Sequence, residues 1–118
     1  LVPPDRRNPL YTTTRGVGEL LCDALDRGCR NFLIGIGGSA TNAGGAGMLA
    51  ALGFRLLDAA GSPIPDGAAG LEQLCSIDAS AARPELRDCR FSIACLRPPE
   101  GRLPGDDSPA GRCPPAVR

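Results

Sequence analysis

Apolar and polar residues follow one another along the first half of the chain in blocks that predict alternating helices and strands. Residues 12–30 carry leucines and alanines on one face of a 3.6-residue repeat, after three threonines (Thr12, Thr13 and Thr14) that offer N-cap hydroxyls. The nearly continuous apolar run 31–36 is typical of a strand that is buried on both faces of a parallel sheet. Residues 46–52 predict the next helix, which Gly53 ends.

The pattern continues in the second half with shorter elements. Residues 54–57 predict a second strand, which a turn at 58–63 follows. Two short helices are expected at 68–74 and 84–88, and the alternating residues 90–95 predict a third strand. Strands that alternate with helices predict an α/β fold with a partial, mostly parallel sheet and flanking helices.

The composition changes after residue 95. Residues 96–118 hold six of the twelve prolines and show no period of 2 or 3.6. Such a segment buries too little apolar surface to offset its ordering entropy, so we expect a disordered tail. The predicted organisation is an α/β domain over 1–95 and a tail over 96–118. The chain does not begin with Met, which indicates that it starts within a longer protein.

Charge and missing residue types exclude several classes of function. Thirteen acidic residues balance thirteen basic ones, so nothing favours a nucleic-acid partner or an anionic membrane surface. The chain has no His and no Lys, which excludes Ser-His-Asp triads, His-containing zinc sites and the Walker A lysine. No apolar run is long enough to span a membrane, and no signal peptide is visible. We therefore expect a cytoplasmic protein.

The six cysteines form no C-x-x-C pair, a spacing that fits neither a metal ribbon nor a redox motif. Cys22, Cys75 and Cys95 stand in apolar surroundings. We expect buried, reduced thiols rather than a disulfide framework.

The segment 35–47, G-I-G-G-S-A-T-N-A-G-G-A-G, carries the strongest functional signal. It follows a predicted strand and opens a helix, where backbone amides can hold an anion. Glycines let a ligand approach the main chain, and the hydroxyls and the amide add uncharged donors. The alternative is a tight turn whose glycines serve packing alone. The candidate substrate- or phosphate-binding residues of this segment are Gly37, Gly38, Ser39, Thr41, Asn42, Gly44 and Gly45.

The same segment also satisfies the dinucleotide fingerprint G-x-G-x-x-G/A through Gly35, Gly37 and Ala40. Asp58 ends the next predicted strand, about where a ribose-binding acid would lie. A dinucleotide-binding oxidoreductase is therefore an alternative hypothesis, in which Asp58 binds the ribose of the dinucleotide. Otherwise Asp58 is a turn-forming residue.

The run 35–47 closely resembles the G-I-G-G-S-A-T-N-D-G-G-A-G signature of bacterial type 1 glycerate kinases. The upstream R-N-P-L at 7–10 and T-T-T-x-G-x-G-E-L at 12–20 resemble a second region of that family, and the resemblance covers residues 1–95. It implies ATP-dependent phosphorylation of D-glycerate, with Mg²⁺ to neutralise the phosphates. On the same resemblance, Asn8 and Thr13 flank the site and Glu19 contributes a carboxylate. Local turn, capping and solvated-surface roles are the alternatives for these three residues.

Two departures from the family pattern bear on activity. Ala43 stands where the family motif has Asp, and Leu96 follows Cys95 where the family continues with an Asp-containing run. The Arg/Pro/Gly content of the tail resembles a GC-rich frame translated out of register. We interpret the chain as a truncated or frameshifted fragment that is inactive alone, and a non-catalytic ligand-binding fragment is the alternative. The sequence assigns no catalytic residue and no metal ligand.

Overall fold

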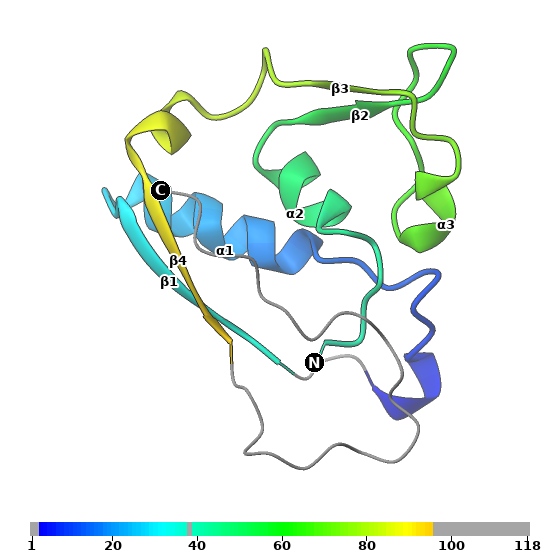
Figure 1. Cartoon of the computed structure of the whole chain (residues 1–118), viewed down its shortest axis with the longest axis horizontal. Coiled ribbons are helices and arrows are strands. Elements are labelled where there is room, and N and C mark those ends of the chain that lie inside the picture. The colour runs from blue at the N-terminus through cyan, green and yellow to red at the C-terminus, as the bar shows by residue number, and fades with distance from the viewer. Residues whose placement is uncertain (1–2, 38, 96–118) are drawn as a thin grey trace.

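The computed structural model describes residues 3–37 and 39–95, so the expected disorder of 96–118 falls outside the described residues. Helices and strands alternate through most of the described chain (Figure 1). The elements, in chain order, are η1 (Pro4–Arg6), α1 (Arg15–Asp26), β1 (Asn31–Ile36), α2 (Ala46–Ala51), β2 (Arg55–Leu57), α3 (Ala68–Leu71), β3 (Ser76–Asp78), η2 (Pro84–Asp88) and β4 (Arg90–Cys95).

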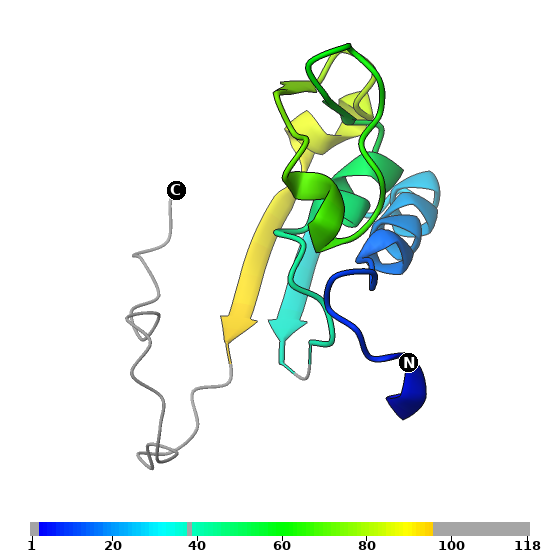
Figure 2. The same ribbon diagram turned by 90° about the vertical axis from the view of Figure 1, so that its right-hand side faces the viewer.

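Two small sheets organise the fold. Strands β1 and β4 pair in parallel, in a register that runs from Asn31 opposite Arg90 to Ile36 opposite Cys95. Figure 2 shows both strands pointing the same way, with α1 beside them. This arrangement confirms the predicted α/β class with a partial, mostly parallel sheet and flanking helices.

The second strand was expected in that same sheet, and the structure differs. β2 pairs antiparallel with β3, an element that the sequence analysis missed, from Arg55 opposite Asp78 to Leu57 opposite Ser76. β3 is three residues long, which is too short for an alternating pattern to be recognised. The expected helix at 84–88 is a 3₁₀ helix, η2.

Helix α1 begins at Arg15, three residues later than predicted, with Thr14 as its N-cap residue. Thr12, where the helix was expected to begin, instead donates a hydrogen bond from its hydroxyl to the carbonyl oxygen of Ala40. At the other end, Gly28 has a φ of 88°, which is the left-handed conformation that favours glycine after a helix.

The core lies between α1, α2 and one face of the β1–β4 sheet. Leu21, Leu25 and Leu52 are buried, and Phe32 and Ile34 pack against them. The prediction that β1 is buried on both faces is wrong, because Leu33 on its other face is 76% exposed. The strand alternates between an exposed and a packed side over residues 31–34, since the core helices cover one face only, and its last two residues are both exposed.

Four cysteines of the described chain carry free thiols: Cys22, Cys29, Cys75 and Cys89. The expected burial is wrong for Cys75, which is exposed, whereas Cys22 is partly buried. No helix within residues 3–37 and 39–95 has the length and apolar character needed to cross a membrane.

Candidate functional site

The glycine-rich loop connects the end of β1 to the start of α2. Its second half is a tight turn, in which the Ala46 N–H donates to the Ala43 carbonyl oxygen over 2.9 Å. The two residues within this turn, Gly44 and Gly45, have φ angles of 55° and 79°. Residues other than glycine rarely adopt this conformation, so the backbone geometry of the turn is enough to explain why glycine stands at both positions.

Other glycines of the region are required by packing between the helices. A Cβ on Gly47 would collide with the Thr13 hydroxyl and would lie 2.8 Å from the backbone nitrogen of Arg15. A Cβ on Gly18 would lie 2.6 Å from the Ala51 Cβ. The helices α1 and α2 therefore touch through their backbones.

Gly37 differs from the glycines of the turn and of the helix contact. Its φ is not in the left-handed region, and a Cβ added to it would meet no atom within 4 Å. Neither the backbone nor packing in the described part of the chain requires a glycine there. Glycine leaves the main chain open to a close approach from outside. The neighbouring Gly38 lies outside the described residues.

Hydroxyl and amide side chains gather at the middle of the loop. Ser39 Oγ lies 3.0 Å from Thr41 Oγ1, and it accepts a hydrogen bond from the Thr41 backbone N–H over 3.3 Å. Ser39 and Asn42 are exposed, and Thr41 is partly buried. Because this loop holds no carboxylate and no cation, it offers uncharged hydrogen-bond donors to a ligand.

The threonine run that precedes α1 docks against this loop and α2. Thr12 is buried, and its hydroxyl donates to the Ala40 carbonyl oxygen. Thr14 Oγ1 accepts the Met48 backbone N–H over 3.0 Å, and Thr13 Oγ1 accepts the Arg15 backbone N–H over 3.2 Å. The sequence analysis read the first and third threonines only as helix caps and so missed both contacts. Three consecutive hydroxyls beside a glycine-rich loop were the signal available.

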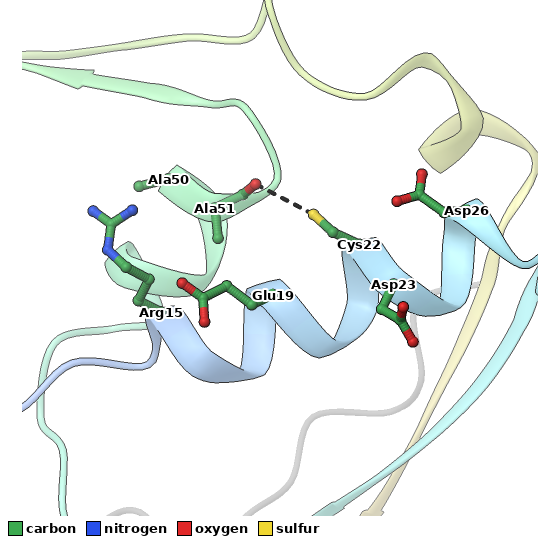
Figure 3. Close-up of a pocket in the computed structure, with 7 residues that line it drawn as sticks. All are labelled: Arg15, Glu19, Cys22, Asp23, Asp26, Ala50 and Ala51. Atoms are coloured by element: carbon green, nitrogen blue, oxygen red, sulfur yellow. Dashed lines mark hydrogen bonds between the residues drawn. The ribbon is translucent and has the colours of Figure 1, made fainter.

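Two further predicted site residues lie apart from the hydroxyls of the loop. Asn8 Oδ1 accepts the Leu10 backbone N–H over 3.1 Å, which is turn chemistry. Glu19 is exposed on the second turn of α1 and lines an open hollow of about 490 Å³ (Figure 3). The hollow lies between α1 and the C-terminal half of α2. The side chains that line it are Arg15, Glu19, Cys22, Asp23, Asp26, Ala50 and Ala51.

The cations near this region are already paired. Arg15 binds Asp66 through two hydrogen bonds, of 3.2 Å from Nε and 3.1 Å from Nη2, which raise the pKa of Arg15. Arg55 lies 3.7 Å from Asp78, whose pKa is lowered first by the Ser80 backbone N–H. Both guanidinium groups thus have a carboxylate partner, although the two ion pairs are partly exposed to solvent and therefore weak.

Asp58 has a role in the turn that follows β2. Its Oδ1 accepts the backbone N–H groups of Ala60 and Ser62, each over 2.9 Å. One oxygen of the carboxylate is therefore engaged in the turn, which favours the turn-forming interpretation of this residue.

The segment 35–47 offers hydroxyl, amide and backbone N–H groups, and no carboxylate that could bind a divalent metal ion. Mg²⁺ is held by carboxylate and phosphate oxygens in octahedral geometry. Within the described ranges, no group of three or more acidic, Cys or His side chains could hold a metal ion. Backbone N–H groups and hydroxyls bind carboxylate or phosphate oxygens instead.

These features define an α/β protein with a glycine-rich strand-to-helix loop whose polar side chains are uncharged hydroxyl and amide groups. The chain belongs to the glycerate kinase family, since the model of that family matches residues 1–96. It is 59% identical to a glycerate kinase of Bacillus subtilis (strain 168) and 54% identical to a glycerate 2-kinase of Escherichia coli (strain K12), in each case over 95 residues, 80% of this chain and 25% of the relative.

A solved structure agrees with these relatives. A Salmonella typhimurium LT2 protein assigned as glycerate kinase 2 superposes with a TM-score of 0.77 at 55% identity, over 80% of this chain and 26% of that chain. The chain thus spans about a quarter of the length of the curated relatives it matches. The resemblance read from the sequence is confirmed at the level of the family.

Proposed function

We propose that the chain supplies the anion-binding loop of a kinase that transfers the terminal phosphoryl group of ATP to a hydroxyl of D-glycerate. Membership of the glycerate kinase family supports the reaction class. The observation that carries the role of the loop is Gly37, because neither its backbone nor its packing against residues 3–37 and 39–95 requires a glycine. Close approach of a ligand to the main chain would explain why this position has no side chain.

The proposed ligand contacts combine main-chain amides with hydroxyls. A carboxylate or phosphate oxygen accepts hydrogen bonds from these donors without any proton transfer. The proposed contact residues of the loop are Gly37, Gly38, Ser39, Thr41, Asn42, Gly44 and Gly45. Asn8 and Thr13 flank them, and Glu19 adds a carboxylate from α1. The geometry supports Thr13 most directly, because its hydroxyl lies against Gly47 at the start of α2.

ATP is the proposed phosphoryl donor, and Mg²⁺ is the proposed metal ion that neutralises the charge of its phosphates. Because the segment 35–47 holds no carboxylate, no step of the reaction is assigned to a metal held by the loop. The proposed extent of the α/β domain is 1–95, followed by the tail 96–118. We place the protein in the cytoplasm, since the four free thiols suit a reducing compartment.

The chain by itself is expected to give no measurable phosphorylation of D-glycerate. It has no Lys, the guanidinium of Arg15 is bound to Asp66, and Ala43 stands where the family motif has a carboxylate. Loss of one charge-stabilising group costs about 2.7–4 kcal/mol of transition-state stabilisation, so several losses leave nothing above background. A coupled assay of ADP release, with ATP, Mg²⁺ and D-glycerate, tests this expectation. Turnover above a no-enzyme control would contradict it.

A variant sharpens this test. The Ala43 side chain is 2% exposed, so Ala43→Asp would bring a carboxylate into a buried position without a charged partner on the loop. We expect Ala43→Asp to lower stability and to leave the activity at background. Recovery of turnover in this variant would show that the single carboxylate carries the chemistry.

Non-catalytic ligand binding is the second candidate function, and the absence of any charged side chain from the segment 35–47 favours it. Titration with D-glycerate, ATP and NADH separates the hypotheses. A response to D-glycerate or ATP without turnover supports binding alone. A response to NADH only would favour the dinucleotide-binding alternative, in which Asp58 would bind a ribose as well as its own turn.

A further inference from the structure

We propose that Thr12 is a positioning residue, which orients the Ser39 and Thr41 hydroxyls for the oxyanion of the ligand. This inference rests on the proposed function. The Thr12 side chain is 8% exposed, so it is too buried to contact a ligand itself. Its hydroxyl instead donates to the carbonyl oxygen of Ala40, 28 residues further along the chain.

The peptide bond between Ala40 and Thr41 transmits this contact. It is a trans peptide, so its carbonyl oxygen and its N–H point in opposite directions. The carbonyl oxygen accepts the buried Thr12 hydroxyl, and the N–H donates to Ser39 Oγ over 3.3 Å. Both sides of one rigid plane are therefore held, and rotation of that plane would break both hydrogen bonds together.

The exposed end of this arrangement is a pair of hydroxyls. Ser39 Oγ and Thr41 Oγ1 lie 3.0 Å apart, and either of them can donate to the other. When Ser39 donates, the Thr41 hydroxyl hydrogen stays available for an oxyanion. An anion that accepts this hydrogen selects one of the two arrangements. Thr12 keeps the pair in place for that selection by fixing the peptide between the two residues.

If Thr12 had only a structural role, its loss would lower the stability of the fold without changing ligand affinity. Three variants separate this role from the positioning role. Thr12→Val removes the hydroxyl and keeps the side-chain shape, whereas Thr12→Ser keeps the hydroxyl. Thr14→Val is the matched control, since it makes the same change two residues away. Its hydroxyl accepts the Met48 backbone N–H over 3.0 Å and forms no hydrogen bond with residue 37 or with residues 39–45.

The test uses the ¹⁵N-labelled 118-residue chain and follows amide shifts during titration with D-glycerate and with inorganic phosphate. Loss of one hydrogen bond predicts about five- to tenfold weaker binding in Thr12→Val. Thr12→Ser is expected to stay within about twofold of the wild type. Thr14→Val is expected to lose comparable stability with unchanged affinity. Exchange of the Thr41 amide hydrogen should accelerate in Thr12→Val alone.

Equal weakening in Thr12→Val and Thr14→Val would overturn the proposal, as would an unchanged Thr41 amide in Thr12→Val. If Thr12→Val does not fold, Thr12→Ser decides, because a loss of about tenfold there would mean that the hydroxyl is not what matters. If the wild type binds neither anion, the proposed function fails. Faster Thr41 exchange confined to Thr12→Val would then still support the positioning of the loop.

Discussion

The contact between α1 and α2 and the sheet of β1 and β4 are assembled by opposite means. At the helix contact, Gly18 and Gly47 remove side chains so that two backbones meet, and threonine hydroxyls complete the junction. At the sheet, apolar side chains remain in solvent, with Leu33 76% and Ile93 55% exposed. The helix contact is thus stabilised within the described residues, while the sheet gains little from its outward side chains.

A pair of leucines gives the largest expected contrast between these regions. Leu25 of α1 is 2% exposed and belongs to the core, so Leu25→Ala is expected to lower the free energy of unfolding by about 2–5 kcal/mol. Leu33→Ala makes the same change on the exposed face of β1 and should stay within about 0.5 kcal/mol. Urea denaturation measures both. Equal losses would mean that the outward face is buried in solution.

A pair of glycines on α1 tests the backbone contact itself. Gly18→Ala places a Cβ 2.6 Å from both the Ala51 Cβ and the Met48 carbonyl oxygen, so we expect a loss of about 1–3 kcal/mol from overpacking. At Gly16 of the same helix an added Cβ meets no atom within 4 Å. Gly16→Ala should therefore gain about 0.4–1 kcal/mol by restricting the unfolded chain.

Thermal unfolding of the two glycine variants decides between the alternatives. A midpoint that falls for Gly18→Ala and rises for Gly16→Ala supports direct contact of the helix backbones. Similar midpoints in both variants would mean that α1 and α2 are further apart than in the structure.

The smallest expected effect concerns the ion pairs that link α1 to the segment just before β4. Arg83, which precedes η2, lies 2.6 Å from Asp26 of α1 and 2.9 Å from Glu85. The hydrogen bond from Arg83 lowers the pKa of Glu85 below its ordinary value of 4.5. A carboxyl with a lowered folded-state pKa stabilises the protein above its unfolded pKa, and this contribution is lost as the pH falls.

We therefore expect stability to decrease as the pH falls below about 4.5, and to decrease less steeply in Glu85→Gln. Unfolding midpoints of the two proteins between about pH 3 and pH 7 measure the difference. Parallel profiles would show that this ion pair contributes nothing in solution, as is common for exposed pairs.

The elements that sequence reasoning found are those with a local signal. The run 31–36 and the helix that starts at Ala46 follow from short-range pattern and glycine positions alone. The strand β3 was missed because its stability comes from pairing with β2 rather than from its own three residues. Leu33 was misjudged because a continuous apolar run does not reveal how many of its faces are covered.

The same distinction holds in the candidate site. The glycine-rich loop was visible as a sequence, together with the hydroxyls of Ser39 and Thr41. The hydrogen bond between Thr12 and Ala40 could not be predicted from the sequence. It joins residues 28 positions apart and depends on how α1 packs against the loop. The family resemblance predicted that Thr13 flanks the loop. Its hydroxyl does lie against Gly47, and it can do so because Gly47 has no side chain.

The pairing of β1 with β4 has a consequence for the order of folding. Asn31 pairs with Arg90, so the two strands are 90 − 31 = 59 residues apart in sequence. α1, β1 and α2 all precede Leu52, and their contacts close much shorter loops. Because short loops close at a lower entropic cost, the helix junction is expected to form first. During synthesis the glycine-rich loop would then take its shape before β4 has left the ribosome.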